Sequence, residues 1–180
     1  MDAKKLRELG IIEMKHQEAE EKLEAMEKVQ LSKFVEVVFN DFNRFFIENE
    51  YDVETTEKTS VAKIGTVKIT LKEQVEAGMY AYLGVMYKME LILSKTKRIN
   101  LEIWINPKKD AFPKSSQYEA GNIKSIQKSL MAIEKVLEQG VALKFDIEVV
   151  ENLGNGDIER SEKKYKNIVD VLKTYIARLE

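Results

Sequence analysis

Two neighbouring segments of alternating hydrophobicity, both within residues 79–106, constrain the fold more than any other part of the chain. Every second residue in each segment is large and apolar, which places those side chains on one face of an extended strand. The first apolar series is Leu83, Val85, Tyr87, Met89, Leu91 and Leu93, and the second is Ile99, Leu101, Ile103 and Ile105. The link between them contains Lys95, Lys97 and Arg98, which suits a solvated turn. The pattern predicts a β-hairpin with one buried face.

Strands and helices are also predicted on the N-terminal side of this hairpin. Residues 4–30 are dominated by helix-forming types, and residues 31–49 carry a wide aromatic stripe that must be buried in a larger body. The change of register near residue 30 predicts either a bend or one helix whose two halves have different roles. Weak alternation over residues 52–58 and clear alternation over residues 65–71 predict two more strands, which extend the hairpin into a meander.

The last third of the chain predicts a helix, a strand and a final helix. Ser116 and Glu119 have the spacing of a capping box, so a helix is expected to begin near Gln117 and to end at Gly140. The strand over residues 143–149 follows a helical crossover and is therefore expected to be able to pair in parallel. Asp157 is the expected cap of a helix that runs to the C-terminus. The chain as a whole predicts an α+β fold, a mostly antiparallel sheet with helices packed on one face.

Composition limits the classes of protein that fit. The 180 residues are 44% hydrophobic, enough for one domain with a core, and the formal net charge is only −2, so no overall field attracts nucleic acid or anionic lipid. The absence of cysteine excludes disulfides, thiol nucleophiles and thiolate metal sites. The first residues lack the apolar stretch of a signal peptide, and no apolar run approaches the roughly 20 residues that span a bilayer. A soluble, cytoplasmic protein is expected.

A narrow apolar stripe in the first helix predicts an interaction segment. The stripe has alternating spacings of four and three residues, typical of a short coiled-coil seam, and comprises Ile12, His16, Ala19, Leu23, Met26 and Gln30. We therefore expect residues 1–30 to project as a helix and residues 31–180 to form a single α+β domain. His16 is the only histidine, so it predicts a polar seam position rather than a metal site, and no cofactor is expected. No serine, histidine and acid arrangement is expected around it.

A second candidate contact surface lies on the outer face of the predicted hairpin. Its members point away from the apolar series and are Tyr80, Tyr82, Met86 and Trp104. Large aromatic side chains with a polar group are preferred anchors of protein interfaces. Two interpretations remain open for this patch: an exposed binding surface, or a face covered by one of the helices.

Acidic residues on the hairpin raise one alternative. Glu90 and Glu102 lie on neighbouring strands near Lys88, and the order of the elements is that of restriction-endonuclease-like folds, in which carboxylates and a lysine hold a catalytic metal. The expected Glu-x-Lys triplet is absent, because Trp104 follows Glu102 by two positions. The alternative hypothesis is a nucleic-acid-binding or degenerate nuclease-like protein, and a third is a domain that binds a small ligand under the helices.

The favoured hypothesis is a non-enzymatic protein-binding protein. It would use the N-terminal helix, with Ile12, His16, Leu23 and Met26 toward a protein partner or a second copy, and the aromatic patch as a second surface. An assembly subunit, an adaptor, or an inhibitor encoded by a phage or another mobile element would each fit. No catalytic residue is predicted.

Overall fold

The chain folds into two compact units. The computed structural model describes residues 3–74, 87–95, 98–107, 119, 121–140, 142–152 and 158–179. One unit, here called the helical unit, consists of Met1–Ser32 and Lys108–Lys144; the other, the sheet unit, consists of Lys33–Pro107 and Phe145–Glu180. Helix α1 (Ala3–Glu48) is continuous through residue 32, so it contributes its first part to one unit and its second part to the other. Of the two forms left open by the change of register, the structure has the single helix.

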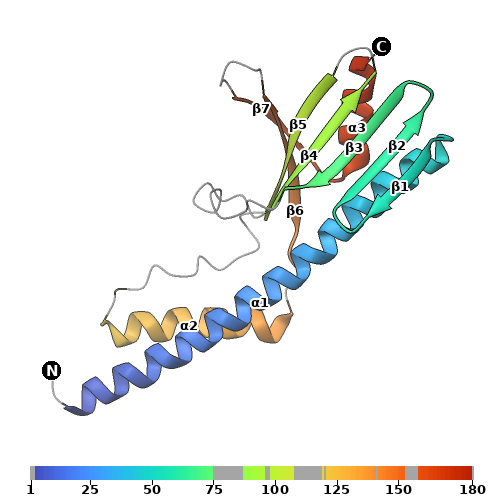
Figure 1. Cartoon of the computed structure of the whole chain (residues 1–180). Helices are drawn as coiled ribbons and strands as arrows, with labels where there is room; N and C mark the ends of the chain where they lie inside the picture. The colour runs from blue at the N-terminus through green and yellow to red at the C-terminus, as the bar shows by residue number, and fades with distance from the viewer. Residues whose placement is uncertain are drawn as a thin grey trace. The chain divides into compact units, whose positions relative to one another are not determined.

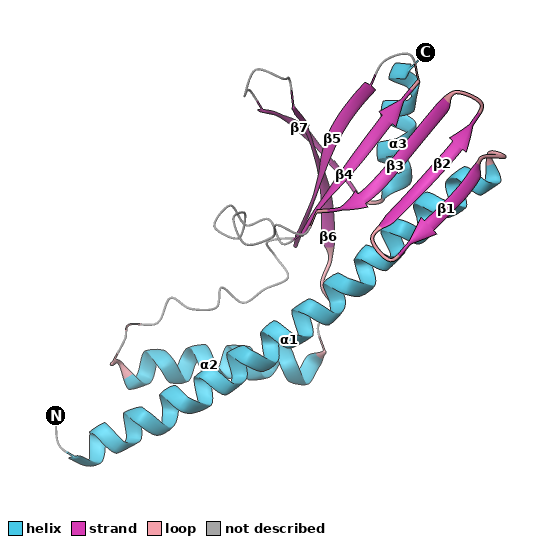
Figure 2. Ribbon diagram, in the orientation of Figure 1, coloured by secondary structure: helices cyan, strands magenta, loops and turns pink. Residues whose placement is uncertain are grey.

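The sheet unit is built on an antiparallel sheet of seven strands in sequence order, which confirms the predicted α+β fold (Figure 2). The strands are β1 (Asp52–Thr56), β2 (Thr59–Ile64), β3 (Val67–Glu73), β4 (Tyr87–Ser94), β5 (Arg98–Pro107), β6 (Phe145–Asn152) and β7 (Ile158–Tyr165). Each strand pairs with the next one along the chain, so the sheet is a simple meander. Since the chain returns after β5 to the same sheet edge, β6 continues the pattern.

The alternation in the central hairpin sets the register of β4 against β5. Met89 lies opposite Ile103 and Leu91 lies opposite Leu101, so the apolar series of both strands share one face. All four of these side chains are fully buried. The predicted hairpin is confirmed for residues 87–95 and 98–107. The part of the first segment before Tyr87 lies outside the described residues.

Helices cover the apolar face of the sheet within the sheet unit. Figure 1 shows the second part of α1 and helix α3 (Ile168–Ile176) on the same side of the strands. The ring of Phe34 in α1 lies 5.0 Å from the ring of Phe145 in β6. In α3, burial and a hydrogen bond with Glu151 of β6 raise the pKa of the Tyr175 phenol far above its ordinary value. The short 3₁₀ turn Ala177–Leu179 then ends the described chain, and its Arg178 also bonds to Glu151.

The end of the chain differs from the expected order of elements at two strands. The strand β6 is antiparallel to β5, and the expected final helix does not begin at residue 157, because Ile158–Tyr165 forms strand β7. Six polar residues separate Ile158 from Tyr165, so their composition suits a helix; pairing with the backbone of β6 overrides that preference. Helix α3 starts later, where the Asn167 side chain accepts a hydrogen bond from the Asp170 amide at 2.9 Å.

Helix α2 (Ile123–Gln139) in the helical unit also begins later than predicted. Its N-cap is Asn122, whose side-chain oxygen accepts a hydrogen bond from the Ser125 amide at 3.2 Å. The predicted start near Gln117 is therefore wrong, and residue 117 itself lies outside the described residues. The predicted end is confirmed: Gly140 has φ 56° and ψ 45°, a left-handed conformation that glycine adopts without a Cβ penalty.

We expect Asn122→Ala to destabilise the helical unit by about 1 kcal/mol, because the Ser125 amide loses its cap. The measurement is amide hydrogen exchange across the first turn of α2, combined with chemical denaturation followed by circular dichroism. Asn122→Asp keeps a capping oxygen and serves as the matched control. Unchanged protection at Ser125 in the alanine variant would contradict the assigned cap.

In the described part of the chain, no helix has both the length and the apolar character needed to cross a lipid bilayer.

Candidate functional site

The helical unit pairs two helices that run in the same direction. The His16 ring in α1 lies 2.9 Å from the Ser129 hydroxyl in α2, and the Gln30 side chain accepts a 2.6 Å hydrogen bond from the Leu143 amide just after α2. Both contacts join residues 113 positions apart in the sequence. Since the separation stays the same along the pair, α1 and α2 are parallel, side by side and in register (Figure 1).

A small apolar core holds these two helices together. Its buried members are Ala19, Leu23, Leu130 and Ile133, with Met26, Val136 and Leu137 packed against them. The stripe predicted as a coiled-coil seam thus faces α2 of the same chain: Leu23 is buried in this core, Met26 packs on its edge, and Ile12 is half-buried. Among the described residues the unit also buries Ile126 and Leu143, which makes six buried apolar side chains, a modest core for two helices.

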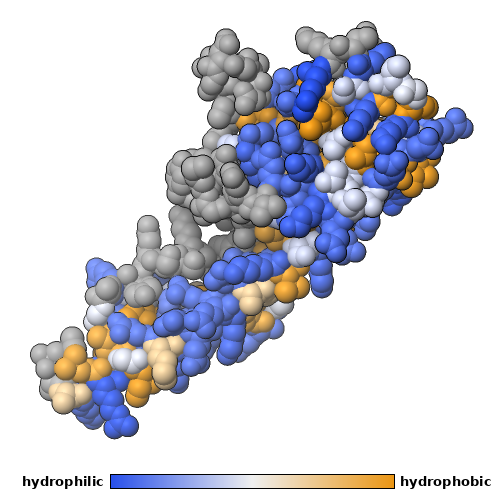
Figure 3. Space-filling view, viewed as in Figure 1, coloured by the Kyte–Doolittle hydropathy of each residue, from blue (hydrophilic) through white to orange (hydrophobic). Residues whose placement is uncertain are grey.

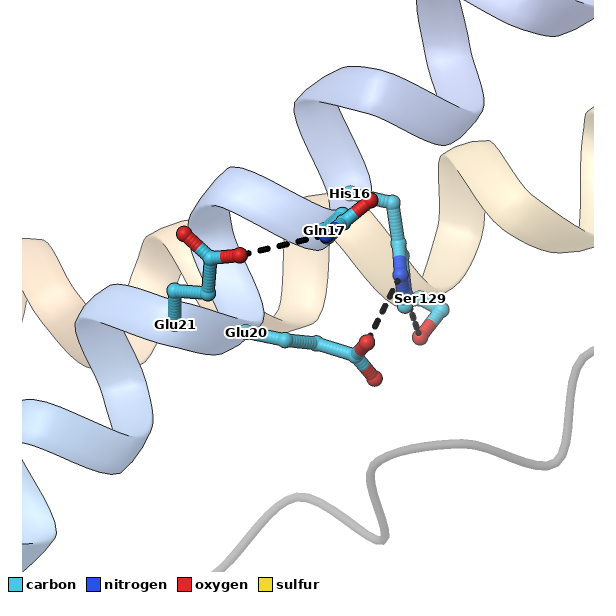
Figure 4. Close-up of polar contacts among 5 residues, drawn as sticks. All are labelled: His16, Gln17, Glu20, Glu21 and Ser129. Atoms are coloured by element: carbon cyan, nitrogen blue, oxygen red, sulfur yellow. Dashed lines mark hydrogen bonds and ion pairs between the residues drawn. The ribbon is translucent and has the colours of Figure 1, made fainter.

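His16 forms the polar part of this helix pair (Figure 4). Its side chain is 2% exposed; Nε2 lies 2.9 Å from the Ser129 Oγ, and Nδ1 lies 3.5 Å from the Glu20 carboxylate. Gln17 donates a separate hydrogen bond to Glu21 on the exposed side of α1. The expectation that no serine, histidine and acid arrangement can be built around His16 is therefore wrong. Sequence reasoning missed it because Ser129 is 113 positions away.

The order of these three groups resembles a hydrolytic triad, but the surroundings favour a structural role. Acyl transfer also needs N–H donors aimed at a developing oxyanion and access for a substrate. Ser129 lies in the middle of α2, where backbone N–H groups are bonded within the helix, and the imidazole beside it is buried. A buried polar pair of this kind fixes the register and direction of two helices.

The outer face of the sheet carries a charged cluster around Glu102. The Glu102 carboxylate accepts hydrogen bonds from Lys88 at 2.8 Å and from the Trp104 indole at 3.1 Å. The Lys88 side chain is 7% exposed, so this ion pair is largely removed from water. Glu90 lies directly opposite Glu102 in the register of β4 and β5. The described residues contain no group of three or more histidine, cysteine or acidic side chains placed to bind a metal ion.

The tryptophan of the predicted aromatic patch is buried. Trp104 is 2% exposed and packs with Val150 of β6, so the interpretation of Trp104 as an exposed anchor is wrong. Tyr80, Tyr82 and Met86 lie outside the described residues, so the patch is not assembled. Figure 3 shows mainly hydrophilic side chains over the exposed part of β4 and β5.

Exposed apolar side chains are concentrated on the helical unit. Among the described residues, eight large hydrophobic side chains are exposed, and five of them belong to this unit: Leu6, Ile11, Met14, Val29 and Met131. Met131 is 69% exposed and faces away from the buried side of α2. Partial burial and the neighbouring Glu24 raise the pKa of the Glu27 carboxyl in the same unit. Sequence reasoning chose the other face of α1, because that face has the regular alternation of four- and three-residue spacings of a coiled-coil seam.

A scan against models of known protein families finds no match, and searches of the curated proteins and of the solved structures find none either.

Proposed function

We propose that this chain is a non-enzymatic, cytoplasmic protein-binding protein whose helical unit makes the contact. The observation that carries the proposal is the concentration of exposed apolar side chains on that unit. Among the described residues, five of the eight exposed large hydrophobic side chains belong to this unit, whose shared apolar cluster is small: its buried members are Ala19, Leu23, Leu130 and Ile133. Apolar groups gathered on a small unit are typical of a protein interaction site.

The helical unit suits an accessory role, such as an assembly subunit, an adaptor or an inhibitor. Its two helices present exposed faces on both sides of their shared core, with Met14 on α1 and Met131 on α2. Methionine side chains are flexible, so they can adapt to the shapes of different partners. Methionine and leucine also bury apolar area without burying a polar group. The sheet unit would then provide the stable body that carries these helices.

The test is affinity purification of the full-length tagged chain from its native host, in the presence of a second copy with a different tag. Met14→Glu and Met131→Glu are compared with the unchanged protein, and Ile47→Glu, an equally exposed position of α1 in the sheet unit, is the control. We expect a stoichiometric protein, or the second copy, to be retained by the unchanged chain and by the control, and to be lost with at least one of the two helical-unit variants.

Retention of the same proteins by all four chains, or recovery of nucleic acid alone, would contradict the proposal. Substitutions are preferable to removal of residues 1–30, because that truncation would uncover Leu130 and Ile133 of α2, which are buried against α1. The truncation would therefore create a new apolar surface instead of removing one.

A further inference from the structure

The exposed side of α1 carries a stripe that is separate from the face against α2. The stripe, here called the outer stripe, comprises Ile11, Met14, Glu18, Lys22, Ala25 and Val29, all of which are exposed. At about 100° per residue the stripe lies roughly 130° around the helix from the line through His16, Ala19 and Leu23. The next residues on this face of α1 are polar, Arg7 before the stripe and Ser32 after it. The apolar residues of the outer stripe therefore end at Ile11 and Val29.

The outer stripe is complementary to a reversed copy of itself. Its apolar residues lie toward the two ends, and the oppositely charged Glu18 and Lys22 lie at equal distances on either side of position 20. An antiparallel copy related by a two-fold axis at that position would place Ile11 against Val29 and Glu18 against Lys22. Each of these contacts occurs twice in such a pair, because a two-fold interface uses the same surface on both chains.

From this symmetry we infer that the occupant of the outer stripe is a second copy of this chain, bound antiparallel. The inference rests on the proposed function and identifies the partner of one face of the helical unit. A parallel pair would bring Glu18 onto Glu18 and Lys22 onto Lys22, and like charges opposite one another oppose association. In the described residues Glu18 and Lys22 form no ion pair with each other, whereas Glu24 and Lys28, with the same spacing in the same helix, are 2.7 Å apart.

Charge reversal tests this inference, with the mass of the full-length chain measured by analytical ultracentrifugation over a range of concentrations. We expect the unchanged chain to form a dimer that is weakened at least about tenfold by either Glu18→Lys or Lys22→Glu, because each change places like charges together twice. An equimolar mixture of the two variants is expected to recover dimers, since every pair across the interface is then attractive. Circular dichroism serves as the folding control.

Orientation is tested by crosslinking, because the chain has no cysteine of its own. Positions 11 and 29 are 18 residues apart in sequence, about 27 Å along a helix. Ile11→Cys mixed with Val29→Cys is therefore expected to form disulfide-linked dimers under mild oxidation, and Ile11→Cys alone is not.

An unchanged chain that stays monomeric, charge variants that dimerise equally well, or a mixture that recovers nothing would each overturn the inference. Crosslinking of Ile11→Cys with itself would overturn the antiparallel arrangement. A monomeric chain that still retains a different protein in the purification described above would overturn only this inference and leave the proposed function standing.

Discussion

Phe42→Ala is expected to destabilise the sheet unit by about 3–5 kcal/mol, the usual cost of removing a buried aromatic ring. Phe42 is fully buried on the part of α1 that lies in this unit, and its ring centre is 4.8 Å from that of Phe46. Phe46 in turn packs edge-on against Phe45 and Tyr51. The alanine leaves a cavity in this aromatic group, and the neighbouring side chains relax only partly into such a cavity.

Chemical denaturation followed by the fluorescence of Trp104 measures this loss, since Trp104 is the only tryptophan and lies in the sheet unit. Val37→Ala, at an exposed position of the same helix, is the matched control and is expected to change stability by less than about 0.5 kcal/mol. Equal effects of the two substitutions would show that this part of α1 does not provide the cover of the sheet.

Glu102→Ala is expected to cost about 2–3 kcal/mol, because it takes the carboxylate away from a buried ammonium and from the Trp104 indole at once. The Glu102 side chain is itself one quarter exposed, which reduces the expected loss below that of a fully buried pair. Denaturant titration of the unchanged and variant chains gives the difference in free energy of unfolding.

Two further chains make this measurement specific. Glu54→Ala breaks the Lys63 ion pair on the exposed part of the same sheet and is expected to leave stability unchanged within error. Adding Lys88→Met to Glu102→Ala is expected to restore part of the lost stability, because the buried charge is then removed as well. A loss that Lys88→Met does not reduce would show that the ion pair has no part in the effect.

Sequence patterns predict the structure correctly where the deciding interaction joins residues that are close together in the sequence. The alternation of Met89 and Leu91 with their neighbours predicts both the strand and its buried face, because side chains of a strand alternate with a period of two. Gly140 predicts the end of α2 for an equally local reason, its left-handed conformation. The same reasoning missed β2 and β7. In these strands pairing with a neighbour, rather than their own composition, decides the structure.

Long-range contacts account for the rest of the differences. The spacing of Leu23 and Met26 predicts a helix with a packing stripe, but nothing in α1 indicates that the stripe is filled by Leu130 and Ile133 of the same chain. The burial of Trp104 and the meeting of His16 with Ser129 have the same cause. Periodicity identifies a buried face of a helix without identifying what buries it.

The contacts of α1 with Ser129 and Leu143 also bear on the synthesis of the chain, because each partner follows 113 residues later in the sequence, after strands β1 to β5. At about 5–20 residues per second, the ribosome adds each of these α1 residues roughly 6–23 s before its partner. During that interval the strands β1 to β5 can begin to pair, while Ala19 and Leu23 remain uncovered on the nascent chain. Helix α1 is thus made well before its packing is complete, and its uncovered Ala19 and Leu23 make this part of the newly made chain prone to bind a chaperone or to aggregate.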